Sequence, residues 1–422
     1  LLYWRAQCQA HVAPFEAVER FGRAVVRFRE AGDAVGGLLA WAGGPPLIQA
    51  AGRDLRAQDA WVRLGEERIA ALPGFPSPDV ELPVVGAMFI ALAFRRPDHP
   101  KLGALRERVL ALASTGRPVR LQIAMVSTAI IVHDVFHRGE LVEAEHALAV
   151  LLPSEDDTAP PFVRMASAWG RSAVCFLKGD FEGSRRAAEA GLRLVEETGI
   201  RVMECHLRGM VAHSYFVAED PGPAGPALAA MEASVPPHAL LDRSLTDLFT
   251  GWFEHIRGNA AAARRCQDRA FRIQRTVGMV LHEPMYQIIE AIARHALGER
   301  EEARERLRQG RAVAEEQGAQ FYRFMGSFVA ADLALEEGRE DEALAPLRQA
   351  LALAREKSYV LILWWHRARA ARLLALALEH GIEPEYALQL IRLHRLPPPP
   401  GAAAPEGWPF PLRIRTLGRF EV

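Results

Sequence analysis

The sequence predicts an all-α fold, a right-handed superhelix of stacked helical hairpins that ends in a short β-strand. The first observation is a fixed spacing of turns, because Gly258, Gly298 and Gly338 lie 40 residues apart. Midway between these turns, and one step beyond them, stand Gly278, Gly318 and Ser358. A helix of about 17 residues, ~25 Å long, fits each gap, and glycine ends a helix at little conformational cost. A constant period of this length indicates an α-solenoid.

The second observation is a set of small residues at constant positions inside each unit. Five residues after each turn glycine, and again seven residues later, stand Ala263 and Ala270, Ala303 and Gly310, Ala343 and Ala350. Seven residues are nearly two helical turns, so both sites lie on one helix face. Small side chains there let two helices approach closely. The same register recurs upstream at Gly179, Ser184, Gly191 and Gly199.

Residues 1–118 predict irregular N-terminal hairpins of the same solenoid. Helices are expected at 1–10, 14–29, 55–72, 80–94 and 102–114. The turn Ala31-Gly32-Asp33 is of the repeat type, but Pro45 and Pro46 interrupt the helix that follows it. The Pro- and Gly-rich run 73–78 predicts a loop.

Residues 119–395 predict the regular array. Hairpins are expected at 119–157, 160–198 and 200–236, then around the three strict turns, and last at 359–395. The proline-rich residues 396–411 predict a linker. In residues 412–422 the side chains alternate with a period of two, which predicts a strand. Since so short a segment cannot form a domain, we expect it to be the first strand of a truncated one.

Composition narrows the class of protein. The chain has 422 residues, is 50% hydrophobic and 24% charged, and has a net charge of −1, as in soluble globular proteins. Near-neutral charge gives no reason to expect nucleic acid or an anionic membrane along the whole chain. The four cysteines form no CxxC pair and no leader segment precedes the helices, which predicts a cytoplasmic protein without disulfides.

The spacing Gly-x4-Ala-x6-Ala resembles the tetratricopeptide repeat (TPR), stretched to about 40 residues. The helical region, with phrases such as KGDFEGSRRAAEAGLRLVEETG and LILWW, resembles the MalT-like TPR sensor region of large bacterial regulators. The closing LRIRTLGRFEV resembles the opening of the winged-helix domain in activators of the bacterial transcriptional activator domain (BTAD) class.

The resemblance implies two further domains outside this fragment, an NTPase domain before it and the winged helix after it. DNA would be contacted only through that missing winged helix. The chain itself has no Gly-x4-Gly-Lys-Ser/Thr loop, so no nucleotide or other cofactor site is expected here.

His133 and His137 stand four residues apart, in a spelling close to the HExxH zinc motif. A third ligand could come from Glu140, Glu143 or His146. However, the motif needs a glutamate base where this sequence has Asp134, and the pair ends a repeat helix just before a turn. Ordinary helix residues are therefore the favoured interpretation, and neither a metal site nor any catalytic residue is expected.

The concave wall of the superhelix is the predicted binding site. Aligning the repeats places nine first-helix side chains toward this groove: Trp169, Phe176, Trp252, His255, Ile288, Ile292, His295, Phe328 and Asp332. Aromatic and apolar groups with a few polar ones suit capture of a peptide or small molecule. The alternative is that they pack between adjacent units. Trp364-Trp365-His366 is a further cluster, in which at least one tryptophan is expected to pack the last hairpin.

The expected function is a ligand- or protein-sensing region of a cytoplasmic transcriptional regulator, which couples an effector in the groove to DNA-dependent activation. Self-association is expected as part of the response, and membrane binding is not. The alternative is a protein-interaction scaffold unrelated to transcription. Neither interpretation makes the chain an enzyme.

Overall fold

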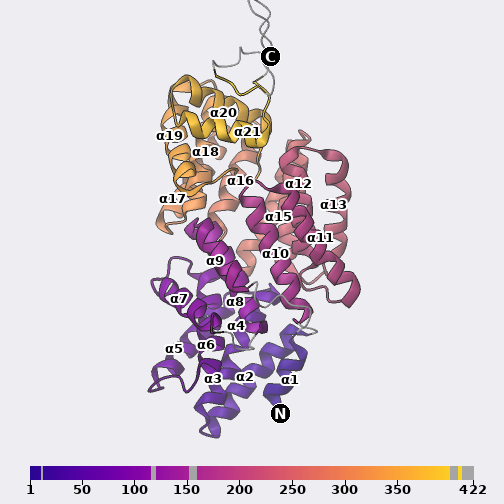
Figure 1. Cartoon of the computed structure of the whole chain (residues 1–422), viewed down its shortest axis with the longest axis vertical. Coiled ribbons are helices and arrows are strands. Elements are labelled where there is room, and N and C mark those ends of the chain that lie inside the picture. Colours follow the sequence, from indigo (N-terminus) through magenta and orange to yellow (C-terminus); the bar gives the residue numbers. More distant parts are fainter. Residues whose placement is uncertain (11–12, 116–119, 152–158, 400–406, 411–422) are drawn as a thin grey trace, which may run out of the picture.

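The computed structural model describes residues 1–10, 13–115, 120–151, 159–399 and 407–410 (Figure 1). These residues form helices and no β-strand, which confirms the all-α prediction. The predicted strand at 412–422 lies outside the described residues. So do residues 400–406 and 411 of the predicted linker.

The N-terminal part consists of α1 (Leu2–Gln9), α2 (Pro14–Glu30), α3 (Ala34–Ala42), α4 (Gly44–Ala51), α5 (Ala57–Ala70), α6 (Pro78–Arg95) and α7 (Lys101–Ala113). The break between α3 and α4 falls where the two prolines predict it. A Cβ atom added at Gly43 or Gly44 would lie 2.5 Å from the ring of Phe21 or Trp61. Glycine is needed at both positions because two aromatic rings pack directly on the backbone there.

Seven hairpins follow. Their helices are α8 (Arg120–His133) continued by the π-helix η1 (Asp134–Arg138), α9 (Leu141–Leu151), α10 (Pro161–Leu177), α11 (Phe181–Thr198), α12 (Glu204–Ala218), α13 (Pro221–Ser234), α14 (Leu240–Ile256), α15 (Ala260–Val277), α16 (Glu283–His295), α17 (Arg300–Glu316), α18 (Gln320–Glu336), α19 (Glu340–Lys357), α20 (Arg367–Glu379) and α21 (Pro384–His394). Within each hairpin the two helices pack against each other.

The turn glycines adopt the left-handed conformation that the repeat requires. Gly258, Gly298 and Gly338 have φ values of 77°, 81° and 73°. Ser358 takes the same conformation, with φ 60°, although a side chain makes it less favourable there. The small residues Ala263, Ala303, Ala343, Ala270 and Ala350 are all fully buried. The predicted α-solenoid of TPR-like hairpins is therefore confirmed.

The superhelix winds so tightly that parts far apart in the sequence touch. In Figure 1 the N-terminal helices lie at the bottom, α10 to α15 along the right side, and α16 to α21 above α8 and α9. The Tyr359 hydroxyl donates to the Gly139 carbonyl at 2.8 Å, across 220 residues. Near the N-terminal part, the Leu55 amide donates to the Val277 carbonyl at 2.7 Å, and the Val280 amide to Phe94 at 3.1 Å. These contacts close the interior of the solenoid.

One non-helical stretch runs through this interior. Residues 359–366, here called the central segment, precede α20 and are buried except for the half-buried His366. The 40-residue period predicts that these residues begin the first helix of the last hairpin. The structure differs, because the helix begins only at Arg367. Buried backbone carbonyls need partners, and side chains supply them: Tyr386 Oη donates to Tyr359 at 2.8 Å, His394 Nε2 to Val360 at 2.6 Å and Trp252 Nε1 to Trp365 at 3.2 Å.

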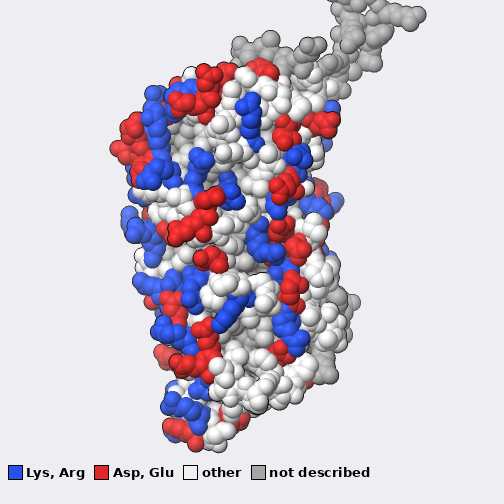
Figure 2. All heavy atoms as spheres, turned by 90° about the vertical axis from the view of Figure 1, so that its left-hand side faces the viewer, with Lys and Arg blue, Asp and Glu red and all other residues white. Residues whose placement is uncertain are grey.

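None of the described helices combines the length and the apolar character needed to cross a membrane. On the face shown in Figure 2, acidic and basic side chains are interspersed, and neither sign covers a continuous area. This face therefore lacks the single-sign field that attracts nucleic acid.

Candidate functional site

A cavity of about 340 Å³ lies inside the superhelix. The first helices of five successive hairpins contribute to its wall, each with a large apolar side chain: Met125, Trp169, Met210, Trp252 and Met285. Helices α4, α6 and α15, the π-helix η1, the central segment and the turns before α12, α14 and α16 contribute the rest of the wall. Concave, mostly apolar pockets with a few polar groups are typical of small-molecule sites.

Five polar side chains of this wall carry buried atoms without a hydrogen-bond partner, namely Gln49, His206, His213, Gln274 and Trp364, and the last three are themselves buried. Both ring nitrogens of His213, the indole nitrogen of Trp364 and the amide oxygen of Gln274 are unpartnered. The other end of the Gln274 amide donates to Ser244 Oγ at 3.0 Å. An unpaired buried donor or acceptor costs about 1–3 kcal/mol. A bound molecule that pairs with these atoms would recover that free energy.

His213, on α12, lies in a box of aromatic rings. It stacks on Phe176 with ring centroids 4.9 Å apart, and it also contacts Phe249 at 4.0 Å and Trp252 at 5.4 Å. Burial among these rings lowers the pKa of His213 to about 3, because a charged imidazolium would lose its hydration. The ring is neutral at physiological pH, so it offers one N–H donor and one acceptor nitrogen.

Trp364 gives the cavity wall a second special feature. Its φ is 62°, a strained conformation that bulky residues rarely adopt. The indole lies over Gly251, where an added Cβ would come within 2.9 Å of it, and stacks on His255 with centroids 5.5 Å apart. Tertiary packing thus holds Trp364 in place, with its N–H unused.

Charge is nearly absent from the cavity wall. Asp242 is its one carboxylate, and no lysine or arginine lines it among the described residues. The Asp242 carboxylate lies 3.9 Å from His206 Nδ1, and both side chains are partly exposed, so this pair marks the solvent side of the cavity. His282 is different, because its Nδ1 is already 2.6 Å from the Tyr322 hydroxyl.

The nine predicted groove residues are buried or nearly buried. Trp169 and Trp252 line the cavity. Phe176 lies against His213, and His255 lies against Trp364, so both support residues of the wall.

The other five are packed elsewhere. Ile288 and Ile292 are buried in α16, and Phe328 stacks on Trp365 with centroids 6.0 Å apart. Asp332 forms an ion pair with Arg369 at 2.7 Å, and His295 Nε2 lies 3.2 Å from Glu337. A binding role for the nine stays a prediction. The repeat alignment does not identify His213, although it occupies a first helix, α12, like the nine predicted residues.

A second, more polar cleft of about 890 Å³ lies on the outside, between α17, α18, α19 and the turn after η1. Two ion pairs flank it, Lys357 with Glu140 at 2.7 Å and Arg323 with Glu315 at 2.6 Å. Arg311 also lines the cleft, and it has no hydrogen bond or ion pair with any described residue. None of the nine predicted residues lines this cleft.

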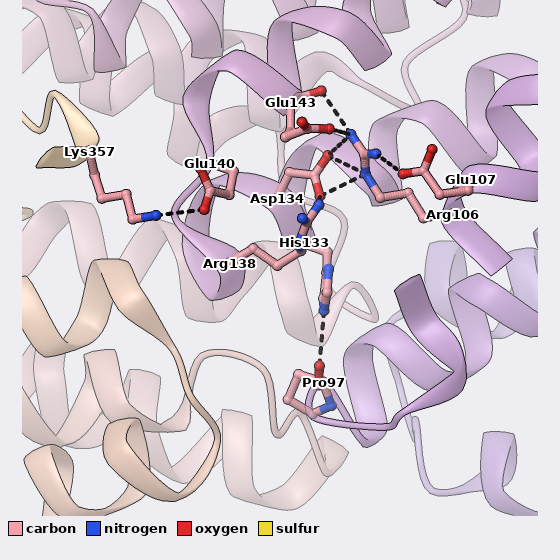
Figure 3. A network of polar contacts seen from close by, with 9 residues as sticks. All are labelled: Pro97, Arg106, Glu107, His133, Asp134, Arg138, Glu140, Glu143 and Lys357. Carbon is pink, nitrogen blue, oxygen red and sulfur yellow. Dashed lines mark hydrogen bonds and ion pairs between the residues drawn. The ribbon is translucent and has the colours of Figure 1, made fainter. Parts of the chain in front are cut away.

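Figure 3 shows His133, the first residue of the candidate metal pair, in a network of polar contacts. His133 Nε2 lies 3.0 Å from the Pro97 carbonyl, and its ring stacks on His137 with centroids 4.8 Å apart. Burial lowers the pKa of His133 to about 4 and that of His137 to about 3. Asp134, fully buried, binds Arg106 at 2.8 Å.

The acidic residues suggested as a third ligand are engaged elsewhere. Glu143 binds Arg106 at 2.8 Å, and Glu140 binds Lys357 at 2.7 Å. Within the described ranges, no three His, Cys, Asp or Glu side chains are grouped to hold a metal ion. The arrangement joins η1 to α7 and α9 through ion pairs.

No protein-family model matches the sequence, and a search of curated proteins finds no match. Among solved structures, the chain is similar to a Rap protein complexed with Competence and Sporulation Factor, with 13% identity and a TM-score of 0.52, over 76% of this chain and 88% of that one. Aspartyl phosphate phosphatase F from Bacillus subtilis is also similar, with 13% identity and a TM-score of 0.43, over 86% of this chain and 94% of that one. At this identity, the likeness to the Rap protein establishes the fold alone: the chain is a TPR-like helical-repeat protein.

Proposed function

We propose that the chain is the effector-sensing region of a cytoplasmic transcriptional regulator, and that the effector binds in the internal cavity. The observation that carries this proposal is the internal, mostly apolar wall in which His213 has no partner for either ring nitrogen. Such unpaired atoms are costly in an empty cavity and useful in a filled one. The role proposed is binding, not catalysis.

Support for a link to transcription comes from the sequence. The closing LRIRTLGRFEV resembles the start of a winged-helix domain, and the repeats resemble the sensor region of MalT-like regulators. The Rap protein of similar fold was solved with a bound factor, which supports a second molecule as the input. NTPase and winged-helix domains of the same regulator, and its self-association, would be the outputs.

The central segment offers a path from the cavity to the C-terminal end of the repeats. Leu363 and Trp364 line the cavity, while Tyr386 and His394 of α21 hold the same segment by hydrogen bonds. A ligand that moves the central segment would therefore move α21, which precedes the proline-rich linker. The switch requires that the ligand bind one arrangement more tightly than the other.

The test is a cavity-filling variant in the complete regulator. Ala129 is buried at the cavity wall on α8, so Ala129→Phe should fill part of the cavity. Val142→Phe introduces the same side chain at an exposed site on α9 and is the matched control.

Small-molecule fractions extracted from the source cells should raise the melting temperature of the wild type and of Val142→Phe, but not of Ala129→Phe. Reporter transcription should respond to the active fraction in the same pattern. If no fraction changes the melting temperature, and Ala129→Phe regulates like the wild type, the cavity is not the sensor.

The second candidate, a protein-interaction scaffold, is favoured by the outer cleft and its unpaired Arg311. A free guanidinium beside an open cleft suits a carboxylate of a partner protein. Arg311→Ala should then weaken a protein complex that Arg300→Ala, at an exposed site on the same helix, leaves intact. Equal binding by both variants would remove the reason for this alternative.

A further inference from the structure

We infer that the ligand of the internal cavity is an uncharged ring compound whose oxygen accepts a hydrogen bond from the Trp364 indole N–H. This inference rests on the proposed function, because it names the class of effector for the same cavity.

The size and composition of the cavity favour rings. Its volume of about 340 Å³ is at the lower end of the roughly 300–1,000 Å³ typical of small-molecule pockets, which suits a molecule of about two or three rings. Trp169, Phe249 and Trp252 present aromatic surface to it. Flat apolar molecules pack favourably against such faces.

The absence of compensating charge argues for a neutral molecule. No lysine or arginine of the described residues lines the cavity to neutralise an anion. Asp242 could attract a cation, but it lies at the solvent side in contact with His206. The histidine in the interior, His213, is held neutral by its aromatic surroundings. Burying an unpaired ionic group would cost far more than burying a neutral polar one.

The unpaired atoms define the polar contacts. Trp364 Nε1–H can only donate, so its partner must be an acceptor such as a carbonyl or ether oxygen. His213 offers both a donor and an acceptor, and Gln274 Oε1 offers an acceptor. A ring compound with a carbonyl and, at another position, a hydroxyl would pair all three side chains. A peptide is a poor fit, because its termini carry charge.

Charge is tested with two fluorescent probes that share one skeleton, 1-anilinonaphthalene and its 8-sulfonate, titrated into the full chain. The neutral probe should bind at least ~10-fold more tightly than the sulfonate, because the wall cannot compensate the anion. Ala129→Phe should abolish the binding of the neutral probe. Circular dichroism checks that the variant folds, and if it does not, Ala51→Leu fills the cavity from a different helix, α4.

The hydrogen bond is tested with a naphthalene probe that carries a ketone, 6-propionyl-2-dimethylaminonaphthalene. Trp364→Phe keeps an aromatic ring and removes the N–H. It should weaken binding of the ketone roughly 2- to 10-fold, the range of one hydrogen bond, and change binding of 1-anilinonaphthalene, which lacks an oxygen, less than ~2-fold.

The outcomes separate this inference from the proposed function. Equal binding of the neutral and sulfonated probes, or an equal effect of Trp364→Phe on both neutral probes, overturns the ligand class and leaves an effector cavity standing. Failure of every probe to bind, or binding that Ala129→Phe and Ala51→Leu do not alter, overturns the cavity as a site for small molecules and with it both proposals.

Discussion

Two consecutive links of the array follow the same period and take different paths. Between α18 and α19 the chain turns in three residues, with Gly338 in the left-handed conformation and open space around it. Between α19 and α20, Ser358 adopts the same conformation, but the central segment then crosses the interior before the next helix begins. The turn is a local property of the backbone, whereas the path after it depends on partners from other hairpins.

The largest expected effect is at the central segment. Trp365 is fully buried between Phe328 and His394, so Trp365→Ala should lower the free energy of unfolding by about 3–5 kcal/mol. Leu297→Ala, at an exposed site in a regular link, should cost no more than about 0.5 kcal/mol. Urea unfolding followed by circular dichroism measures both. Similar losses would mean that the two kinds of link are held alike.

The next largest effect is the pH dependence of folding stability that results from burial of His213. The pKa of His213 is about 3 in the folded chain and near 6.5 when unfolded. Between these values the unfolded chain binds a proton that the folded chain does not, so stability falls as the pH falls below about 6.5. From about pH 7 to about pH 5 the loss from His213 alone is about 2 kcal/mol.

The matched variant is His213→Phe, which keeps a ring among the neighbouring aromatics and cannot titrate. Other buried histidines, among them His133 and His282, also have lowered pKa values, so the variant should still lose stability in acid, with a smaller slope. Parallel pH profiles of the melting temperature for wild type and variant would show that His213 is not held neutral.

A smaller effect is expected at the turns themselves. Gly338→Ala places a Cβ at φ 73° and should cost about 1–2 kcal/mol, although nothing crowds the site. Ser358→Gly relieves the same strain and should raise stability by about 0.5–1 kcal/mol. Opposite signs in one set of unfolding curves would confirm that both links begin with the same local geometry.

The smallest effect concerns the ion pair across the superhelix. Lys357 and Glu140 are partly exposed, with their charged atoms 2.7 Å apart, so Glu140→Gln should cost about 0.5 kcal/mol and less in high salt. Glu301→Gln, whose partner Arg304 lies on the same helix, is the control for a local pair. A loss above about 2 kcal/mol would place this contact among the main supports of the closed structure.

Most of the fold could be predicted from the sequence because its signals are local. The left-handed glycines and the buried alanines occupy the positions that the period assigns to them. The candidate site was harder, because repeat spacing fixes the helices within a unit but not how tightly successive units wind. Trp169 and Trp252 reach the cavity, whereas Phe328 and Asp332 meet Trp365 and Arg369 instead.

His213 and the central segment are features of the candidate site that the repeat spacing does not predict. The sequence around a histidine in an apolar helix does not indicate whether its ring nitrogens will find hydrogen-bond partners in the fold. The repeat period predicts that the LILWW run begins a helix. Instead, its backbone carbonyls and those just before it accept hydrogen bonds from the side chains of Trp252, Tyr386 and His394, which lie 27 to 113 residues away along the chain.

The hydrogen bond from Tyr359 to Gly139 has a consequence for dissecting this protein. Repeat arrays usually tolerate removal of end units, since each unit contacts only its neighbours. Here, truncation after α17 would remove the contacts of η1 with α18. It would also remove the central segment, whose Leu363 and Trp364 line the internal cavity. Truncated versions would thus lose cooperative unfolding and the internal cavity together. The smallest fragment that can bind the ligand is therefore close to the whole array.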